Sequence, residues 1–273
     1  MNVEYFIAKR LFYAKEKNNR YTRPIFYIAI LAITLSISIM LLSIVVLNGF
    51  KDNISKKAIG FKGHISITNF TDNQSFETEP ISINQPFYPN ITTRGDIKNI
   101  NVFATKAGII KTNDEILGVM LKGVSSDYDW DFFKKNLIRG EVLNINDTIK
   151  TSHIFISKYI SDILKIDVGD DLFMYFIQKP NRVIKFLVKG IYNTSLTEFD
   201  KLFVLADIRH IQRLNKWSDT QVGGFEITID NFDKINFVTN QLYKEINYNL
   251  NAENIKDKNP QLFAWLDLQD MNV

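Results

Sequence analysis

The 273-residue sequence contains no cysteine and only three histidines. Without cysteine there is no disulfide, no thiolate metal ligand and no cysteine nucleophile. The histidines are far apart, and none belongs to the His-Glu-x-x-His pattern of zinc proteases. The Gly-x-x-x-x-Gly-Lys-Ser/Thr loop that binds nucleotide phosphates and the Gly-x-Ser-x-Gly turn of α/β-hydrolases are also missing. These absences argue against an enzyme, and we expect neither a cofactor nor a metal ion.

Positive charge is concentrated at the start of the chain. Six of the 33 basic residues lie within the first 24 positions, together with only two of the 30 acidic residues. The rest of the chain carries 27 basic and 28 acidic side chains. A body that is so nearly neutral offers little attraction for nucleic acid, so we expect no nucleic-acid partner.

One long apolar run follows the basic segment. Residues 25–47 include no charged side chain over 23 positions. A helix of that length spans about 35 Å, which is enough to cross the hydrocarbon core of a bilayer. A signal peptide has a shorter apolar region that ends in a small-residue cleavage site. We therefore predict a transmembrane helix over residues 25–47.

The flanks of this span predict its orientation. Basic residues are more frequent before the span than after it, which favours a cytoplasmic N-terminus. The large domain that follows would then lie outside the cytoplasm. Residues 1–24 carry apolar side chains at helical spacing and predict an amphipathic helix in the inner interface of the membrane.

The predicted span carries a stripe of small residues, namely Ala29, Ala32, Ser36 and Ser43. Small side chains let neighbouring helices approach closely in lipid, where no hydrophobic force drives their association. We predict that this face packs against other membrane helices. The alternative is a lone anchor on which the small residues have no partner.

The remaining sequence mixes short strands and short helices, which gives an α+β fold class. A helix continues beyond the span over residues 48–60. Apolar or alternating runs predict strands at 64–68, 101–110, 116–124, 154–157, 202–205 and 225–229, and a hairpin of 171–177 with 183–188. Helical spacing predicts helices at 158–164, 207–215, 232–248 and 260–270. We interpret the acidic Glu198-Phe199-Asp200 as a solvated turn between two strands.

Several motifs follow one another in the order of a known family. They are Phe6-Ile-Ala-Lys-Arg-Leu-Phe, the segment Ile154–Leu172 with its Val-Gly-Asp, and Phe186-Leu-Val-Lys-Gly-Ile-Tyr followed by Glu198-Phe-Asp. In this order they resemble the lipoprotein-releasing (Lol-type) ABC transporter permeases. These belong to a wider class with a MacB-like periplasmic core domain and an FtsX-like membrane domain.

The resemblance implies a two-part periplasmic domain over residues 48–258. A membrane-proximal subdomain of βα units would comprise residues 60–115 and 223–258. A mainly β subdomain, residues 116–222, would be inserted in it. Residues 259–273 look like the start of a helix that leads to a second membrane span, so we expect a chain truncated before that span.

The resemblance also implies a function and partners. The chain would be a permease subunit in a bacterial inner membrane that extracts acylated lipoproteins for release towards the outer membrane. A separate cytoplasmic ATPase subunit would hydrolyse ATP, so the chain itself would be no enzyme. The other expected partners are a second permease copy or paralogue, the lipoprotein cargo, the lipid bilayer, and a periplasmic carrier or adaptor.

The sequence departs from this family at one hairpin. In the family member that docks the periplasmic carrier, a protruding hairpin precedes the Phe-x-Val-x-Gly strand. Here only five residues join the two predicted strands: Gln178, Lys179, Pro180, Asn181 and Arg182. They leave room for a tight turn and little for a hook, which puts direct docking of a carrier on this chain in doubt.

Two other functions fit the same sequence. A MacB-type efflux or mechanotransmission permease would use the same domain with a different cargo. A single-span, membrane-anchored periplasmic binding or sensor domain would use the helix as an anchor or a signalling element. The stripe of small residues on the helix favours a permease over a sensor.

Overall fold

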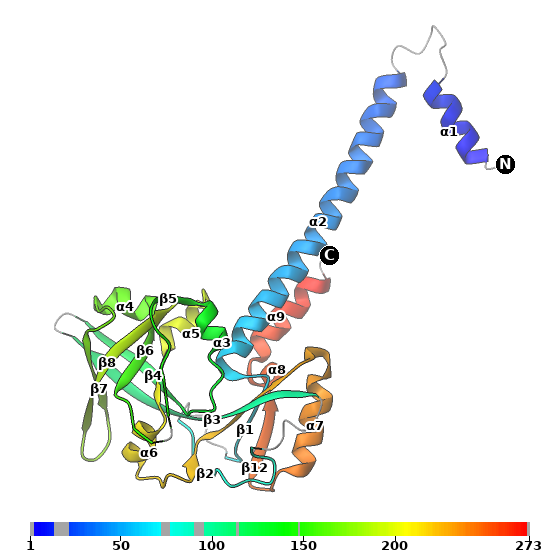
Figure 1. Cartoon of the computed structure of the whole chain (residues 1–273). Helices are drawn as coiled ribbons and strands as arrows, with labels where there is room; N and C mark the ends of the chain where they lie inside the picture. Colours follow the sequence, from blue (N-terminus) through cyan, green and yellow to red (C-terminus); the bar gives the residue numbers. More distant parts are fainter. Residues whose placement is uncertain are drawn as a thin grey trace. The chain divides into compact units, whose positions relative to one another are not determined.

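The computed structural model describes residues 3–13, 22–71, 77–89, 96–112, 115–146 and 148–271 (Figure 1). Two compact units make up the chain: Met1–Lys51 with Leu266–Val273, and Asp52–Trp265. The helices of the first unit are α1 (Val3–Tyr13), the apolar part of α2 (Thr22–Lys62) and the end of α9 (Pro260–Met271). Residues 14–21, within the predicted amphipathic segment, lie outside the described residues.

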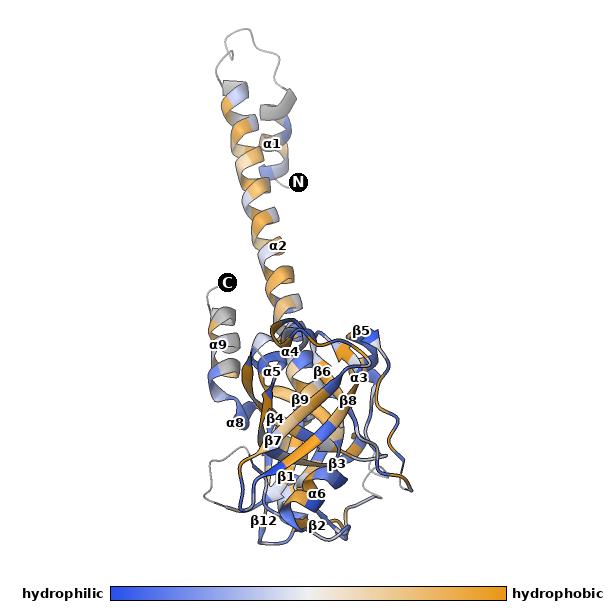
Figure 2. Ribbon diagram, turned by 90° about the vertical axis from the view of Figure 1, so that its left-hand side faces the viewer, coloured by the Kyte–Doolittle hydropathy of each residue, from blue (hydrophilic) through white to orange (hydrophobic). Residues whose placement is uncertain are grey.

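Helix α2 is a single helix of 41 residues that continues without a break past the predicted span. By length and composition it is the one helix among the described residues that could cross a membrane, over Tyr27–Lys62. Its apolar turns form a long orange stretch in Figure 2. The hydroxyl of Thr34 donates to the Ile30 carbonyl at 2.8 Å, so this polar side chain is satisfied within the helix.

Glycine ends α2 and turns the chain into the sheet. Gly63 has a φ of +69°, a left-handed conformation that glycine adopts without a steric penalty. Its N–H donates to the Ile59 carbonyl at 2.7 Å, which satisfies one of the carbonyls left free at the helix end.

The second unit is built on one ten-stranded sheet. Its strands are β1 (Ile65–Asn69), β3 (Ile97–Lys111), β4 (Ile116–Val124), β5 (Leu137–Gly140), β6 (His153–Ser157), β7 (Asp171–Phe176), β8 (Arg182–Tyr192), β9 (Phe203–Asp207), β11 (Gly224–Ile229) and β12 (Leu250–Asn254). A separate pair consists of β2 (Ile81–Ser82) and β10 (Gln221–Val222). The helical segments are α3 (Asp131–Lys135), α4 (Lys158–Leu164), α5 (Thr197–Leu202), α6 (Arg209–Asn215), η2 (Phe232–Lys234), α7 (Ile235–Glu245) and α8 (Ile255–Lys258).

Strand β3 belongs to two parts of this sheet. Its first half pairs with β11, and the sheet continues from β11 through β1 to β12. Its second half starts a circuit that runs through β4, β9, β6, β8 and β7 and returns to β3. Six strands therefore close into a barrel, and the long strand β3 connects the barrel to the open part of the sheet.

The open part of the sheet has one apolar and one polar face. Ile65 and Ile67 of β1 are fully buried, and α7 buries its own apolar side chains, including Val238 and Leu242. Because side chains alternate along a strand, Ser66 and Thr68 project from the opposite face. That polar face becomes one wall of the pocket described below.

The α+β fold class is confirmed: one N-terminal apolar helix precedes a sheet-rich domain. The interpretation of Glu198-Phe199-Asp200 as a solvated turn is wrong. These residues lie in helix α5, where Phe199 and Asp200 are buried. The Asp200 carboxylate accepts hydrogen bonds from the Thr194 N–H at 3.1 Å and the Thr194 hydroxyl at 2.7 Å. These hydrogen bonds replace the water contacts that the Asp200 carboxylate loses on burial.

Candidate functional site

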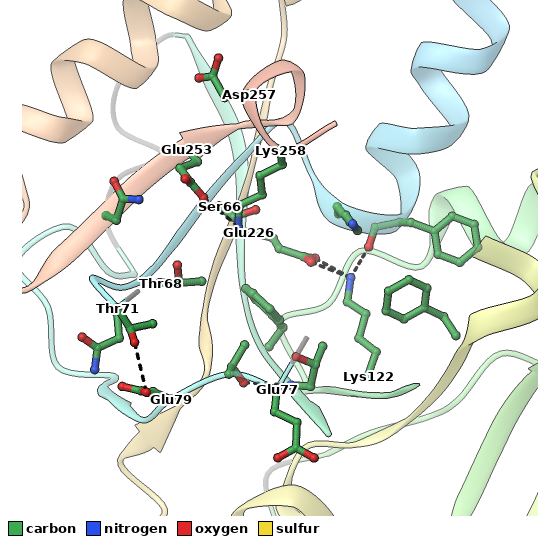
Figure 3. Close-up of a pocket in the computed structure, with 18 residues that line it drawn as sticks. Ser66, Thr68, Thr71, Glu77, Glu79, Lys122, Glu226, Glu253, Asp257 and Lys258 are labelled. Atoms are coloured by element: carbon green, nitrogen blue, oxygen red, sulfur yellow. Dashed lines mark hydrogen bonds and ion pairs between the residues drawn. The ribbon is translucent and has the colours of Figure 1, made fainter. Parts of the chain in front are cut away.

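The last turn of α2 meets the sheet at a buried lysine. The Lys122 ammonium donates to the carbonyl oxygen of Phe61 and contacts the two carboxylate oxygens of Glu226 at 2.8 and 2.7 Å (Figure 3). The Lys122 and Glu226 side chains are only 3% and 6% exposed. We call Phe61, Lys122 and Glu226 the latch.

The latch joins three parts of the domain. Lys122 lies on barrel strand β4, where it stands opposite Thr105 of β3. Glu226 lies on β11 of the open sheet and stands opposite Asn101 of β3. Phe61 belongs to α2, and its carbonyl is one of those that a helix leaves without a partner at its C-terminal end. The single Lys122 ammonium therefore connects the helix, the barrel and the open sheet.

Two aromatic rings lie beside the buried lysine. The Lys122 ammonium lies 5.4 Å from the ring centre of Tyr128 and 5.8 Å from that of Phe103, within range of cation–π attraction. Burial, followed by the nearby Glu226 charge, raises the pKa of Tyr128 well above its usual value. Tyr128 therefore stays neutral beside the ion pair.

The ring of Phe61 anchors the helix end in an aromatic cluster. Its neighbours, with the distances between ring centres, are Phe199 at 5.0 Å, Phe133 at 5.4 Å, Phe132 at 5.7 Å, Tyr192 at 5.9 Å and Phe203 at 6.1 Å. They come from α3, α5, β8 and β9. Close approach of α3 requires Gly60, because a Cβ at that position would overlap the Phe132 ring. Through the Phe61 ring, the final turn of α2 is therefore part of the hydrophobic core at this end of the barrel.

A pocket of about 720 Å³ lies beside the latch. The residues labelled in Figure 3 show its character: hydroxyls of Ser66 and Thr68 line it together with carboxylates and the Lys258 ammonium. Burial lowers the pKa of Lys258, and the charges of Glu253 and Glu226 oppose that shift. The rings of Phe61, Phe103 and Phe203 add apolar surface to this lining.

The described residues include no group of three or more histidine, cysteine, aspartate or glutamate side chains that could hold a metal ion. The buried histidines have structural bonds instead. His64 Nδ1 accepts the Ile229 N–H at 3.2 Å. His210 Nε2 lies 2.7 Å from the Thr151 carbonyl, to which it donates.

The residues singled out from the sequence lie elsewhere. Ala29, Ala32, Ser36 and Ser43 are on the part of α2 that belongs to the first unit, and all four are exposed in this single chain. That they pack against other membrane helices stays a prediction.

The hairpin that was singled out connects β7, which ends at Phe176, to β8, which begins at Arg182. The amide of Gln178 donates to the Leu214 carbonyl at 3.2 Å, so the turn is tied to the end of α6. The effect of this short turn on carrier docking stays a prediction.

Sequence reasoning missed the latch, although a signal was present. Lys122 is the sole charge in the strand sequence Ile-Leu-Gly-Val-Met-Leu-Lys-Gly-Val, and Glu226 is the sole charge in Gly-Phe-Glu-Ile-Thr-Ile. A lone charge within an apolar strand indicates a buried charge that needs a partner.

Two solved structures align with this chain. The extracellular domain of the ABC-type transporter YknZ from Gram-positive bacteria aligns at 14% identity over 70% of this chain and 99% of its own, with a TM-score of 0.46. The periplasmic region of MacB from Actinobacillus actinomycetemcomitans aligns at 14% identity over 76% and 95%, with a TM-score of 0.49. At these scores neither carries a functional argument, and no family model matches the chain.

In sequence, the chain is similar to the lipoprotein-releasing system transmembrane protein LolC of Buchnera aphidicola subsp. Schizaphis graminum. The two are 25% identical over 271 residues, which cover 91% of this chain and 61% of that protein. The chain thus spans about three fifths of the length of this relative. The resemblance to lipoprotein-releasing permeases expected from the sequence motifs is confirmed.

Proposed function

We propose that this chain provides the first membrane span and the extracytoplasmic domain of an ABC transporter permease that releases lipoproteins from a bacterial inner membrane. The observation that carries the proposal is the similarity to a lipoprotein-releasing transmembrane protein over 91% of the chain. The apolar helix α2 and the basic residues before it support a cytoplasmic N-terminus and a periplasmic domain.

The proposed complex contains further components. A cytoplasmic ATPase subunit hydrolyses ATP, and a second copy or paralogue of the permease completes the membrane domain. The small residues Ala29, Ala32, Ser36 and Ser43 contact the other membrane helices, because small side chains permit close helix packing in lipid. The cargo is an acylated lipoprotein, and the chain's own contribution is mechanical.

The latch supports a route for that mechanical step. A displacement of α2 reaches β4 through the Lys122 ammonium and reaches β11 through the Glu226 carboxylate. Both bonds are buried and therefore strong in their low-dielectric surroundings. The aromatic cluster around Phe61 prevents the helix end from sliding independently. The barrel and the open sheet consequently follow the helix together.

Reconstitution tests the proposal. The full chain carrying an affinity tag is purified from membranes of its host, and the complex is placed in proteoliposomes with a fluorescent triacylated lipoprotein. We expect an ATPase subunit to purify with the chain and ATP to release the lipoprotein. An ATPase without its phosphate-binding lysine serves as the control. A chain that purifies without any ATPase, or a complex that hydrolyses ATP without releasing lipoprotein, contradicts the proposal.

A further inference from the structure

A second pocket, away from the latch, is lined by basic residues. It has a volume of about 500 Å³ and lies between α6, the start of β8 and the segment before β6. Four of its lining residues are the cationic Lys150, Arg182, Lys185 and Arg213, and none of the described lining residues is acidic. Figures 1 and 2 show α6 at the end of this domain away from the last turn of α2. We call this second pocket the basic pocket.

Among the described residues, most of these cations form no ion pair with a carboxylate. Lys185 pairs with Asp171 at 2.7 Å. In the part of the chain that the structure describes, Lys150, Arg182 and Arg213 make no ion pair with a carboxylate.

The nearby buried carboxylate, Asp207, is already fully engaged. It pairs with Arg209 at 2.5 Å and accepts the Thr151 N–H at 3.1 Å. Within the described part of the chain, Lys150, Arg182 and Arg213 are therefore three cations of the basic pocket without an ion-pair partner.

The charges are close enough to repel one another. Burial and then the positive charge of Arg213 lower the pKa of Lys150; the Asp207 charge opposes this shift, and Arg209 adds a smaller lowering effect. Like charges brought together in this way destabilise the folded domain unless an anion is bound between them. The buried side chain of Leu214 and the exposed side chain of Val183 also line the basic pocket.

We propose that the basic pocket binds a phosphate-bearing anion. Two arginines and one lysine match the several acceptor oxygens of a phosphate group, since guanidinium groups bind phosphate in a two-pronged geometry. The Ser152 hydroxyl in the lining is a further donor. The volume of about 500 Å³ lies within the range of small-molecule sites and leaves room for a ligand larger than phosphate alone. A soluble phosphorylated compound and a phospholipid headgroup share this chemistry. The proposal does not depend on the proposed function.

Phosphorus NMR of the full chain in maltoside micelles tests this proposal. Inorganic phosphate is titrated with protein, and we expect saturable broadening of its line. Arg213→Gln should weaken binding by about tenfold or more, because a charge-assisted hydrogen bond is lost. Lys244→Gln is the matched control, since it removes one exposed positive charge on α7 outside the pocket. Circular dichroism checks that both variants are folded.

Competition distinguishes the two sources of the ligand. Stronger displacement of phosphate by glycerophosphoglycerol indicates a phospholipid headgroup, and stronger displacement by pyrophosphate indicates a soluble compound. Both results support the proposal. Absence of saturable broadening overturns it, as does an equal loss of binding in Arg213→Gln and Lys244→Gln. A glutamate-rich peptide that binds where phosphate does not would also overturn it, because the site would then accept a protein carboxylate.

Discussion

Replacing Lys122 by methionine should strongly destabilise the domain. Methionine preserves most of the side-chain length but leaves Glu226, which is 6% exposed, as a buried charge without its partner. The Phe61 carbonyl also loses its donor. Breaking one half of a buried ion pair costs about 3–5 kcal/mol, and domains are stable by only about 5–15 kcal/mol. We expect the free energy of unfolding to fall by about 4 kcal/mol.

Urea unfolding of the full chain in micelles measures this change. Trp130 reports on it, because its ring lies 4.9 Å from Tyr128, which is next to the Lys122 ammonium. The control Lys244→Met should change stability by no more than about 0.5 kcal/mol, as for ordinary surface substitutions. The double variant K122M/E226L should recover most of the loss, because apolar residues can replace a buried pair. An unchanged midpoint in Lys122→Met, or no recovery in the double variant, would refute this reasoning.

Two further predictions concern residues near the end of α2. Burial lowers the pKa of His64 to about 4 from an ordinary value of 6.5. As pH falls, the unfolded chain therefore binds a proton at His64 before the folded chain does. The free energy of unfolding should decrease by about 3 kcal/mol between about pH 6.5 and pH 4. Urea midpoints between pH 7 and pH 4 should show this loss of stability, and His64→Leu should reduce it. The loss is assigned to His64 because its Nδ1 accepts the Ile229 N–H and is therefore unprotonated in the folded chain. An equal loss in the variant would contradict this assignment. Gly60→Ala should destabilise the domain by about 1–3 kcal/mol through overlap with Phe132. Gly49→Ala in the same helix should not, because an added Cβ there would meet no atom within 4 Å beyond its chain neighbours and the helix's own backbone. Thermal unfolding of both variants checks this difference, and equal melting temperatures would count against the contact.

Local patterns predicted much of the fold. The apolar run 116–124 and the helix 158–164 have the same bounds as β4 and α4 in the structure. In α4 the local signal is strong, because the Ser157 hydroxyl accepts the Ile160 N–H and caps the helix. Strand β12 was missed because Leu250–Asn254 is mostly polar, and only its pairing with β1 makes it a strand.

The lone charges of two apolar strands indicated buried ions, but the sequence could not pair them or assemble the basic pocket, because both depend on distant parts of the chain. Lys122 and Glu226 are 104 residues apart, and β3 must lie between their strands before they can meet. Asp200 was placed in a solvated turn for the same reason. Burial raises the pKa of Asp200, and the hydrogen bonds from Thr194 oppose this shift. The burial arises from tertiary packing and is not evident from the local sequence.

The most direct test of the account compares lipoprotein release by the reconstituted complex containing the wild-type chain and the one containing K122M/E226L. The double variant keeps an apolar contact in place of the ion pair but removes the bonds that join α2 to both β4 and β11. We predict that ATP hydrolysis persists while ATP-dependent release of the lipoprotein slows markedly, because only the aromatic cluster around Phe61 still holds the helix end. Release at the wild-type rate would contradict the central claim that movement of α2 reaches the domain through the latch.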